Sequence, residues 1–195
     1  LAFICNVVID ADKKVIAAFA GDREQAHYKG VEFEMKLAGV KPVPADIVVT
    51  TNGGYPLDQN IYQSVKGMTA AEATCKDGGV IIDCSSCNDG HGGEDFFNTL
   101  KQANDLQKAM DEILARDRNE TIFDQWESQI LLRLLLHFDI IMVTDAPKDM
   151  VEAMHLKYAS NIDEAFAMAK KILADKGVAD PKVTVIPDGV SVIVK

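Results

Sequence analysis

Four polar side chains recur at helical spacing just after a Gly-Gly loop. They stand at positions i, i+3, i+4 and i+7, which places them on one face of a helix: Gln59, Tyr62, Gln63 and Lys66. A lysine ammonium beside tyrosine and glutamine hydrogen-bond donors suits a small anion such as a carboxylate. The alternative interpretation is an ordinary solvated helix face, from which Lys66 reaches to water.

A second group consists of two cysteines and a histidine. Cys84, Cys87 and His91 have the spacing C-x2-C-x3-H, and two thiolates with an imidazole can bind a soft metal, or the thiol pair can carry redox chemistry. A tetrahedral site would need a fourth ligand from the acidic neighbours, because the sequence contains no second C-x2-C pair. The alternative is that Cys84 ends a buried strand and Cys87 is an inert loop thiol. We expect these cysteines to be reduced, metal-free and dispensable.

Two further segments contain residue types that occur in ligand sites. The Gly-rich stretch 89–95 opens a predicted helix and could offer backbone N–H groups to an anion, but it matches neither phosphate-binding motif. Its glycines favour a tight turn with positive φ. Trp126, the only tryptophan, lies where the polar start of a predicted helix meets the apolar run 130–138, as either a packing residue or a ligand contact.

The elements that must position these residues alternate between strands and helices. From Ala45 onward, short apolar runs at 47–50, 80–84 and 140–144 each lead through a polar loop to a helix. The runs are apolar without alternation, which is typical of parallel strands covered on both faces. We therefore predict an α/β fold, a three-layer sandwich with a mixed, mostly parallel sheet and helices on both faces. In such folds the loops at the carboxyl ends of the strands bind ligands.

The two ends of the chain have their own patterns. Residues 1–44 predict a connecting hairpin and a helix that begins at Asp22 and closes at Gly39, and residues 45–195 predict one compact carboxyl-terminal α/β domain. Near the end, Asn161 begins an amphipathic helix. A Pro-Asp-Gly turn between two apolar runs then predicts a terminal hairpin over 182–194.

Composition excludes several classes of protein. The 195 residues carry a net charge of −10 with a pI of about 4.8, which argues against nucleic acid as a partner. The longest apolar run, 130–143, contains charged residues and is shorter than the roughly 18 residues that a membrane span needs. Four unevenly spaced cysteines favour a reducing cytoplasm over a secreted disulfide framework. Because the chain starts with Leu1 and has no leader, we expect it to be a piece of a longer protein.

Several of these segments together resemble the carboxyl-terminal half of the nickel-dependent lactate racemases. The resemblance lies in NGGYPLDQNIYQSVKGM at 52–68 and TAAEA at 69–73. It continues through DGHGGEDFF at 89–97 and DQWESQ at 124–129, while 7–39 is similar to the segment that joins the two halves of the family. The last forty or so residues carry no matching motif.

The resemblance implies a racemase of 2-hydroxy acids. In that family, two domains close over a nickel pincer nucleotide, which takes a hydride from the α-carbon of the substrate and returns it to either face. The amino-terminal domain holds the lysine that tethers the cofactor, a nickel-ligating histidine and two acid–base histidines. The resemblance therefore implies no catalytic residue in this chain. Residues 1–195 in isolation are expected to be inactive.

The residues that carry over from the family are few. Tyr62, Gln63 and Lys66 are expected to face substrate and cofactor, and Trp126 is expected at the domain interface. The expected partners are a small 2-hydroxy acid and the amino-terminal domain of the same protein. Two other functions stay open, namely a metal or thiol-redox module using Cys84, Cys87 and His91, and a non-catalytic domain that binds a small acid.

Overall fold

The computed structural model of the protein describes residues 2–195. These residues form two compact units, one made of residues 2–41 with 192–195 and the other of residues 42–191. The chain enters the smaller unit first, crosses to the larger one and returns with its last four residues.

The smaller unit is a hairpin with one helix. Strands β1 (Ile4–Ile9) and β2 (Val15–Gly21) pair antiparallel, and α1 (Arg23–Ala38) follows them. The rings of Phe19 on β2 and Phe33 on α1 pack with their centroids 5.6 Å apart. The predicted opening hairpin is therefore confirmed.

The helix of this unit begins and ends where the sequence predicts. The side chain of Asp22 accepts hydrogen bonds from the backbone N–H groups of Glu24 and Gln25, both at 3.1 Å, and so caps two free donors of the first turn. After Gly39, β3 (Gly39–Val40) pairs parallel with β9 (Ile193–Val194).

The larger unit is built on a five-stranded sheet with the order β7-β6-β5-β4-β8. Every pair of neighbouring strands in it is parallel. The strands are β4 (Ala45–Thr51), β5 (Cys75–Cys84), β6 (Asp139–Val143), β7 (Lys157–Ala159) and β8 (Val183–Ile186). Together with the separate antiparallel hairpin, this confirms an α/β fold with a mostly parallel sheet.

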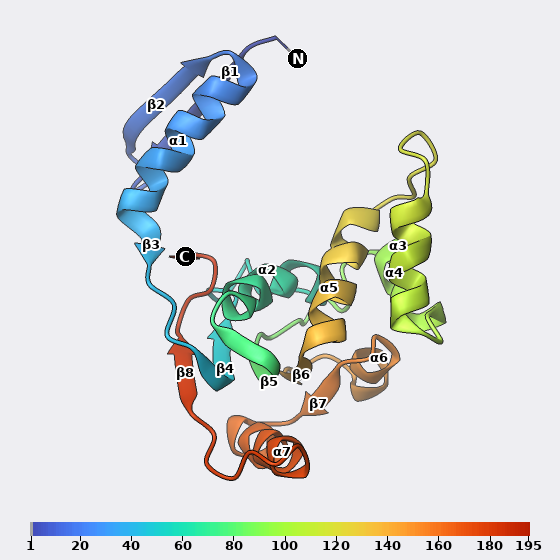
Figure 1. The fold of residues 1–195 in the computed structure, drawn as a ribbon. Helices are drawn as coiled ribbons and strands as arrows, with labels where there is room; N and C mark the ends of the chain where they lie inside the picture. The colour runs from blue at the N-terminus through green and yellow to red at the C-terminus, as the bar shows by residue number, and fades with distance from the viewer. Residues whose placement is uncertain (1) are drawn as a thin grey trace. The chain divides into compact units, whose positions relative to one another are not determined.

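Helices cover both faces of this sheet (Figure 1). Alternate residues of the central strands, such as Ile47 and Ile82, pack with Ala169 of α7 in one buried cluster. The opposite face is covered by α2 and α5, which contact β4, β5 and β6. The helices of this unit are α2 (Ile61–Glu72), α3 (Glu94–Gln102), α4 (Leu106–Ala115), α5 (Gln125–His137), α6 (Lys148–Ala153) and α7 (Ile162–Asp175).

The predicted terminal hairpin is wrong. β8 lies in the main sheet, where Ile47 of β4 pairs with Val183 in parallel register. The turn after β8 does form, since Asp188 accepts a hydrogen bond from the backbone N–H of Val190 at 3.1 Å. The chain then leads to β9, which pairs with β3 instead of returning along β8. Among the helices of residues 2–195, none is long and apolar enough to cross a membrane.

Candidate functional site

The helix that carries the candidate anion anchor is fixed at its amino end by the Gly-rich loop. The side chain of Asn60 accepts a hydrogen bond from the N–H of Gln63 at 3.0 Å. The N–H groups of Ile61 and Tyr62 donate to the carbonyl oxygens of Gly90 at 3.0 Å and His91 at 3.1 Å. The first three donors of α2 are therefore used within the chain, which leaves them unavailable to an anion.

The glycines of this loop are required by its shape. Gly90 and Gly92 have φ angles of 73° and 86°, which L side chains rarely adopt. A Cβ atom at Gly92 would lie 2.5 Å from Oδ1 of Asn60, the residue that caps α2. The expected tight turn is confirmed, and its function here is to close against the start of α2.

Further along the helix, Gly67 brings α2 close to the end of β4. A Cβ atom at Gly67 would lie 2.7 Å from the carbonyl oxygen of Thr51, so only glycine allows this approach of helix and strand. The side chain of Asn52 accepts a hydrogen bond from the N–H of Gly67 at 2.9 Å. These contacts place α2 just beyond the carboxyl end of β4, the edge at which parallel sheets bind ligands.

Three of the four predicted polar residues gather on one helix face. Tyr62 and Gln63 are half-buried and Lys66 is exposed, and Nζ of Lys66 donates a hydrogen bond to Oε1 of Gln63. Gln59 is not part of this face, because α2 begins at Ile61 and Gln59 precedes its cap. A cation, a phenol and an amide are therefore close together, and the lysine among them is exposed.

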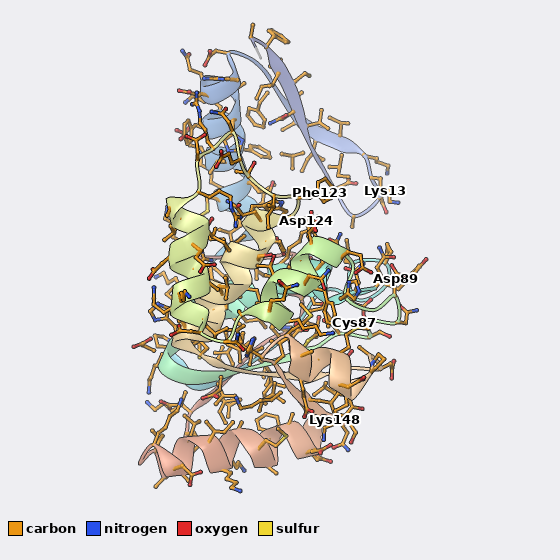
Figure 2. All side chains as sticks on the ribbon, turned by 90° about the vertical axis from the view of Figure 1, so that its right-hand side faces the viewer. Lys13, Cys87, Asp89, Phe123, Asp124 and Lys148 are labelled. Atoms are coloured by element: carbon orange, nitrogen blue, oxygen red, sulfur yellow. The ribbon has the colours of Figure 1, made fainter. Side chains whose placement is uncertain are left out.

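The start of α5 packs against Tyr62 of this group. The hydroxyl of Tyr62 donates to Oδ1 of Asp124 at 3.3 Å, and its ring meets the rings of Phe96 and Trp126 edge-on at centroid distances of 5.4 and 5.8 Å. Trp126, half exposed, therefore lies beside Tyr62. Figure 2 shows Phe123 and Asp124 together at this end of α5.

Burial and negative charge keep Tyr62 in its phenol form. Burial, then the charges of Asp124 and Glu127, raise the pKa of Tyr62 to about 12. At neutral pH the side chain is therefore a hydrogen-bond donor that cannot take part as a base.

Glu127 is a component of the site that the sequence did not predict. Its side chain is buried with 1% of the residue exposed, and neither carboxylate oxygen has a hydrogen-bond partner among residues 2–195. Burial raises the pKa of Glu127 to about 7, the charge of Lys66 lowers it, and the charge of Asp124 raises it. The sequence predicts only a polar start for this helix, and the pattern of 124–129 contains no signal for a buried acid.

The cysteine and histidine group does not come together as a metal site. Sγ of Cys87 is buried 3.4 Å from Oγ of Ser64, and the ring of His91 stacks on Phe97 at 4.6 Å while its Nδ1 accepts from the N–H of Gly93 at 3.2 Å. The part of the chain that the structure describes contains no cluster of three His, Cys, Asp or Glu residues able to hold a metal ion. Burial raises the pKa of Cys84 and Cys87 to about 11, which makes both poor thiolates at neutral pH. The metal or redox alternative therefore has no support.

A second buried acid lies in the sheet beneath the site. Asp83 on β5 is fully buried, and its carboxylate oxygens have no hydrogen-bond partner among the described residues. Ile82 and Cys84 pack towards α7, so alternation along the strand points Asp83 to the face that α2 and α5 cover. Burial raises the pKa of Asp83 to about 7.

This raised pKa predicts how stability depends on pH. The folded state favours protonated Asp83, so its contribution to stability is fully present below the ordinary pKa of 3.8 and is lost as pH rises through about 7. Replacing Asp83→Asn should therefore raise the free energy of unfolding, relative to the parent, by at least about 1 kcal/mol more at pH 8 than at pH 4. Urea unfolding at both pH values measures the difference. Exposed Asp180→Asn is the control, and parallel curves for the parent and the Asp83 variant would contradict the prediction.

Known proteins match this chain over its whole length. Residues 40–194 match the family model of the lactate racemase C-terminal domain. Curated proteins named lactate racemase are 56% identical in Thermoanaerobacterium thermosaccharolyticum and 51% identical in Lactiplantibacillus plantarum, each over 196 residues. Both comparisons cover 100% of this chain and 45% of the relative, so the chain spans about half the length of the curated relatives it matches.

Solved structures agree with this comparison. The lactate racemase apoprotein from Thermoanaerobacterium thermosaccharolyticum superposes with a TM-score of 0.89 at 56% identity, covering 100% of this chain and 46% of that one. A protein from Thermotoga maritima superposes with a TM-score of 0.60 at 17% identity over 99% of this chain and 49% of its own, which shows the fold alone. Since the family model spans most of its length, the chain belongs to the lactate racemase C-terminal domain family.

Proposed function

We propose that the chain is the carboxyl-terminal part of a racemase of lactate-type 2-hydroxy acids, in which it covers the substrate and the cofactor. The observation that carries this proposal is the gathering of Tyr62, Gln63 and Lys66 on one face of α2, where the start of α5 packs against Tyr62. Both relatives at 51–56% identity are named lactate racemase, which supports the substrate class.

The chemistry of these side chains suits the fixed part of such a substrate. A racemase must hold the carboxylate still while the hydrogen on the α-carbon is removed and returned to either face. Lys66 supplies a positive charge and the amide of Gln63 supplies a hydrogen-bond donor. The phenol of Tyr62 can donate to the substrate by exchanging its hydrogen bond to Asp124. Together they anchor the carboxylate and leave the hydroxyl-bearing carbon accessible to groups from elsewhere in the protein.

The hydrogen-bond donors of α2 fit the polar parts of a nickel pincer nucleotide. Residues 2–195 contain no cluster of side chains that could ligate its metal. When bound, that cofactor supplies the acceptor and donor of the hydride. We assign its attachment and its nickel ligands to the preceding domain. Tyr62, Gln63 and Lys66 would then contact its polar edge, and Trp126 would exclude water beside it.

The amino-terminal domain of the same protein is the proposed partner. Relatives of about twice the length support a preceding domain. Near the site, Phe123 is 77% exposed and Trp126 is 52% exposed, and large aromatic residues at such a surface are typical of protein contacts.

The full-length protein tests the proposed function. We expect the purified cofactor-loaded protein to convert L-lactate to a mixture of both enantiomers, as followed by chiral chromatography. A panel of other 2-hydroxy acids measured in parallel identifies the preferred substrate. Failure to racemise any member of the panel, with the cofactor shown to be bound, would overturn the proposal.

A further inference from the structure

A buried carboxylate on α5 follows directly after Trp126, whose ring contacts Tyr62 of α2, and it has no hydrogen-bond donor of its own. Glu127 is 1% exposed, and both its oxygens lack hydrogen-bond partners among the described residues. An unpaired charge in such a place is costly, so the group must find a cation or take up a proton. The inference that follows rests on the proposed function, because it assumes that a substrate carboxylate binds at Lys66.

Lys66 is the cation whose charge acts on Glu127. The charge of Lys66 on α2 favours the ionised form of Glu127. The charge of Glu127 in turn raises the pKa of Tyr62. From the start of α5, Asp124 opposes ionisation of Glu127. The site therefore holds two acids and one cation around a phenol that stays neutral.

The other elements packed against α5 contribute little charge to this group. The buried residues of α3 and α4 are apolar, and Arg116 at the end of α4 donates to Gln125. On β5, Asp83 is influenced by Ser85 and Asp58. After burial, which raises the pKa of Glu127, Lys66 is therefore the charged group that acts most strongly on it. A second anion near that lysine would weaken its effect on Glu127.

The ammonium of Lys66 is not committed to either acid in this structure. It donates to Gln63, and no carboxylate of the described residues lies within 4.0 Å of it. Its long side chain leaves it able to meet a ligand on the exposed side of α2. A bound carboxylate would place a second negative charge beside the same ammonium.

We propose that Glu127 is a positioning residue that competes with the substrate carboxylate for the charge of Lys66, so that substrate binding is coupled to the uptake of one proton from solvent by Glu127. The coupling is reciprocal: protonation of Glu127 strengthens binding, and binding strengthens protonation. Because the folded-state pKa of Glu127 is about 7, the coupling acts near neutral pH.

The test uses the full-length cofactor-loaded protein and lactate. In the parent, KM for lactate should rise by at least about fivefold from pH 6 to pH 8, which is the lower end of ordinary coupling between two sites. In Glu127→Gln, the rise in KM over this range should be several-fold smaller than in the parent. Exposed Glu120→Gln, which removes a charge from the loop before α5, should behave as the parent does. The difference between variants is decisive, because groups elsewhere in the protein titrate equally in all of them.

A calorimetric measurement tests the same coupling without turnover. Racemic lactate is already at equilibrium, so its heat of binding, measured in buffers of different ionisation enthalpy, reports proton uptake. The parent at pH 8 should take up a substantial fraction of one proton per site, and Glu127→Gln should lack this uptake. Absence of uptake in the parent would overturn the proposal even if the variant failed to fold.

Lys66→Ala separates this proposal from the function on which it rests. If Lys66→Ala binds lactate as tightly as the parent, the anchor itself is wrong and the proposed function loses its main support. If Lys66→Ala binds weakly but Glu127→Gln keeps the pH dependence of KM and the proton uptake of the parent, only the role of Glu127 is wrong.

Discussion

The purified 195-residue chain will leave L-lactate unracemised, whereas the full-length protein will convert it. Racemisation needs groups that act on both sides of the α-carbon, and the histidines of this chain are not arranged for that. Within the unit 42–191 each has a separate partner: His91 pairs with the N–H of Gly93, His137 with Asp77 and His155 with the carbonyl oxygen of Leu100. His27 belongs to the other unit. Chiral chromatography after long incubation at high protein concentration measures the effect, which is expected to be a complete loss.

A folding control accompanies this experiment. The isolated chain should show cooperative unfolding, because the unit 42–191 has a continuous buried core on its own. Mixing it with the separately produced preceding domain should restore some turnover if the two associate. Racemisation by the isolated chain that persists after rigorous purification would contradict the division of roles between the two domains.

Local patterns in the sequence predicted the helix ends well. Asp22 and Asn161 are the caps of α1 and α7 in the structure, because a short polar side chain before an amphipathic stripe satisfies free N–H groups wherever the helix packs. The predicted helix face also included Gln59, which in the structure precedes the cap of α2. Asp58 and Asn60 are both good caps, and the choice between them depends on the loop 89–93, which docks on Ile61 and Tyr62 from a distant part of the chain.

Strand partners could not be predicted from local patterns. The turn after β8 forms as expected, but the strand pairs with β4, which is more than 130 residues away in the chain. A turn motif specifies a change of direction and carries no information about which edge of a sheet is free. The fold class was still predictable, since unbroken apolar runs require cover on both faces.

Part of the candidate site could be predicted from local sequence patterns, and part depends on how distant helices pack. Tyr62, Gln63 and Lys66 share one face by helical periodicity, a property that the sequence contains. The burial of Glu127 arises because α5 packs on α2, and no spacing within 124–129 reveals which of its polar residues turns inward. The contribution that we propose for Glu127 could therefore not be predicted from the sequence.

Lys66→Ala in the full-length enzyme should lower kcat/KM for lactate by at least about tenfold. The ammonium provides a charge-assisted hydrogen bond, and the loss of one such bond costs on the order of 1.5–3 kcal/mol, roughly 10- to 150-fold. In the proposed function a preceding domain covers this side of α2 and excludes water, which would leave the contact less screened. Steady-state kinetics with cofactor content measured for each variant gives the ratio.

Three further variants serve as comparisons and as a control for the Lys66→Ala result. Tyr62→Phe should have a smaller effect, because it removes a neutral donor and keeps the ring that packs against Phe96 and Trp126. Lys66→Arg should retain part of the activity, since the charge remains while the geometry of its donors changes. Lys108→Ala, which removes an exposed lysine of α4, should match the parent. If Lys66→Ala kept near-normal kcat/KM with the cofactor bound, the polar face of α2 would be an ordinary solvated surface and the anchor would lie elsewhere.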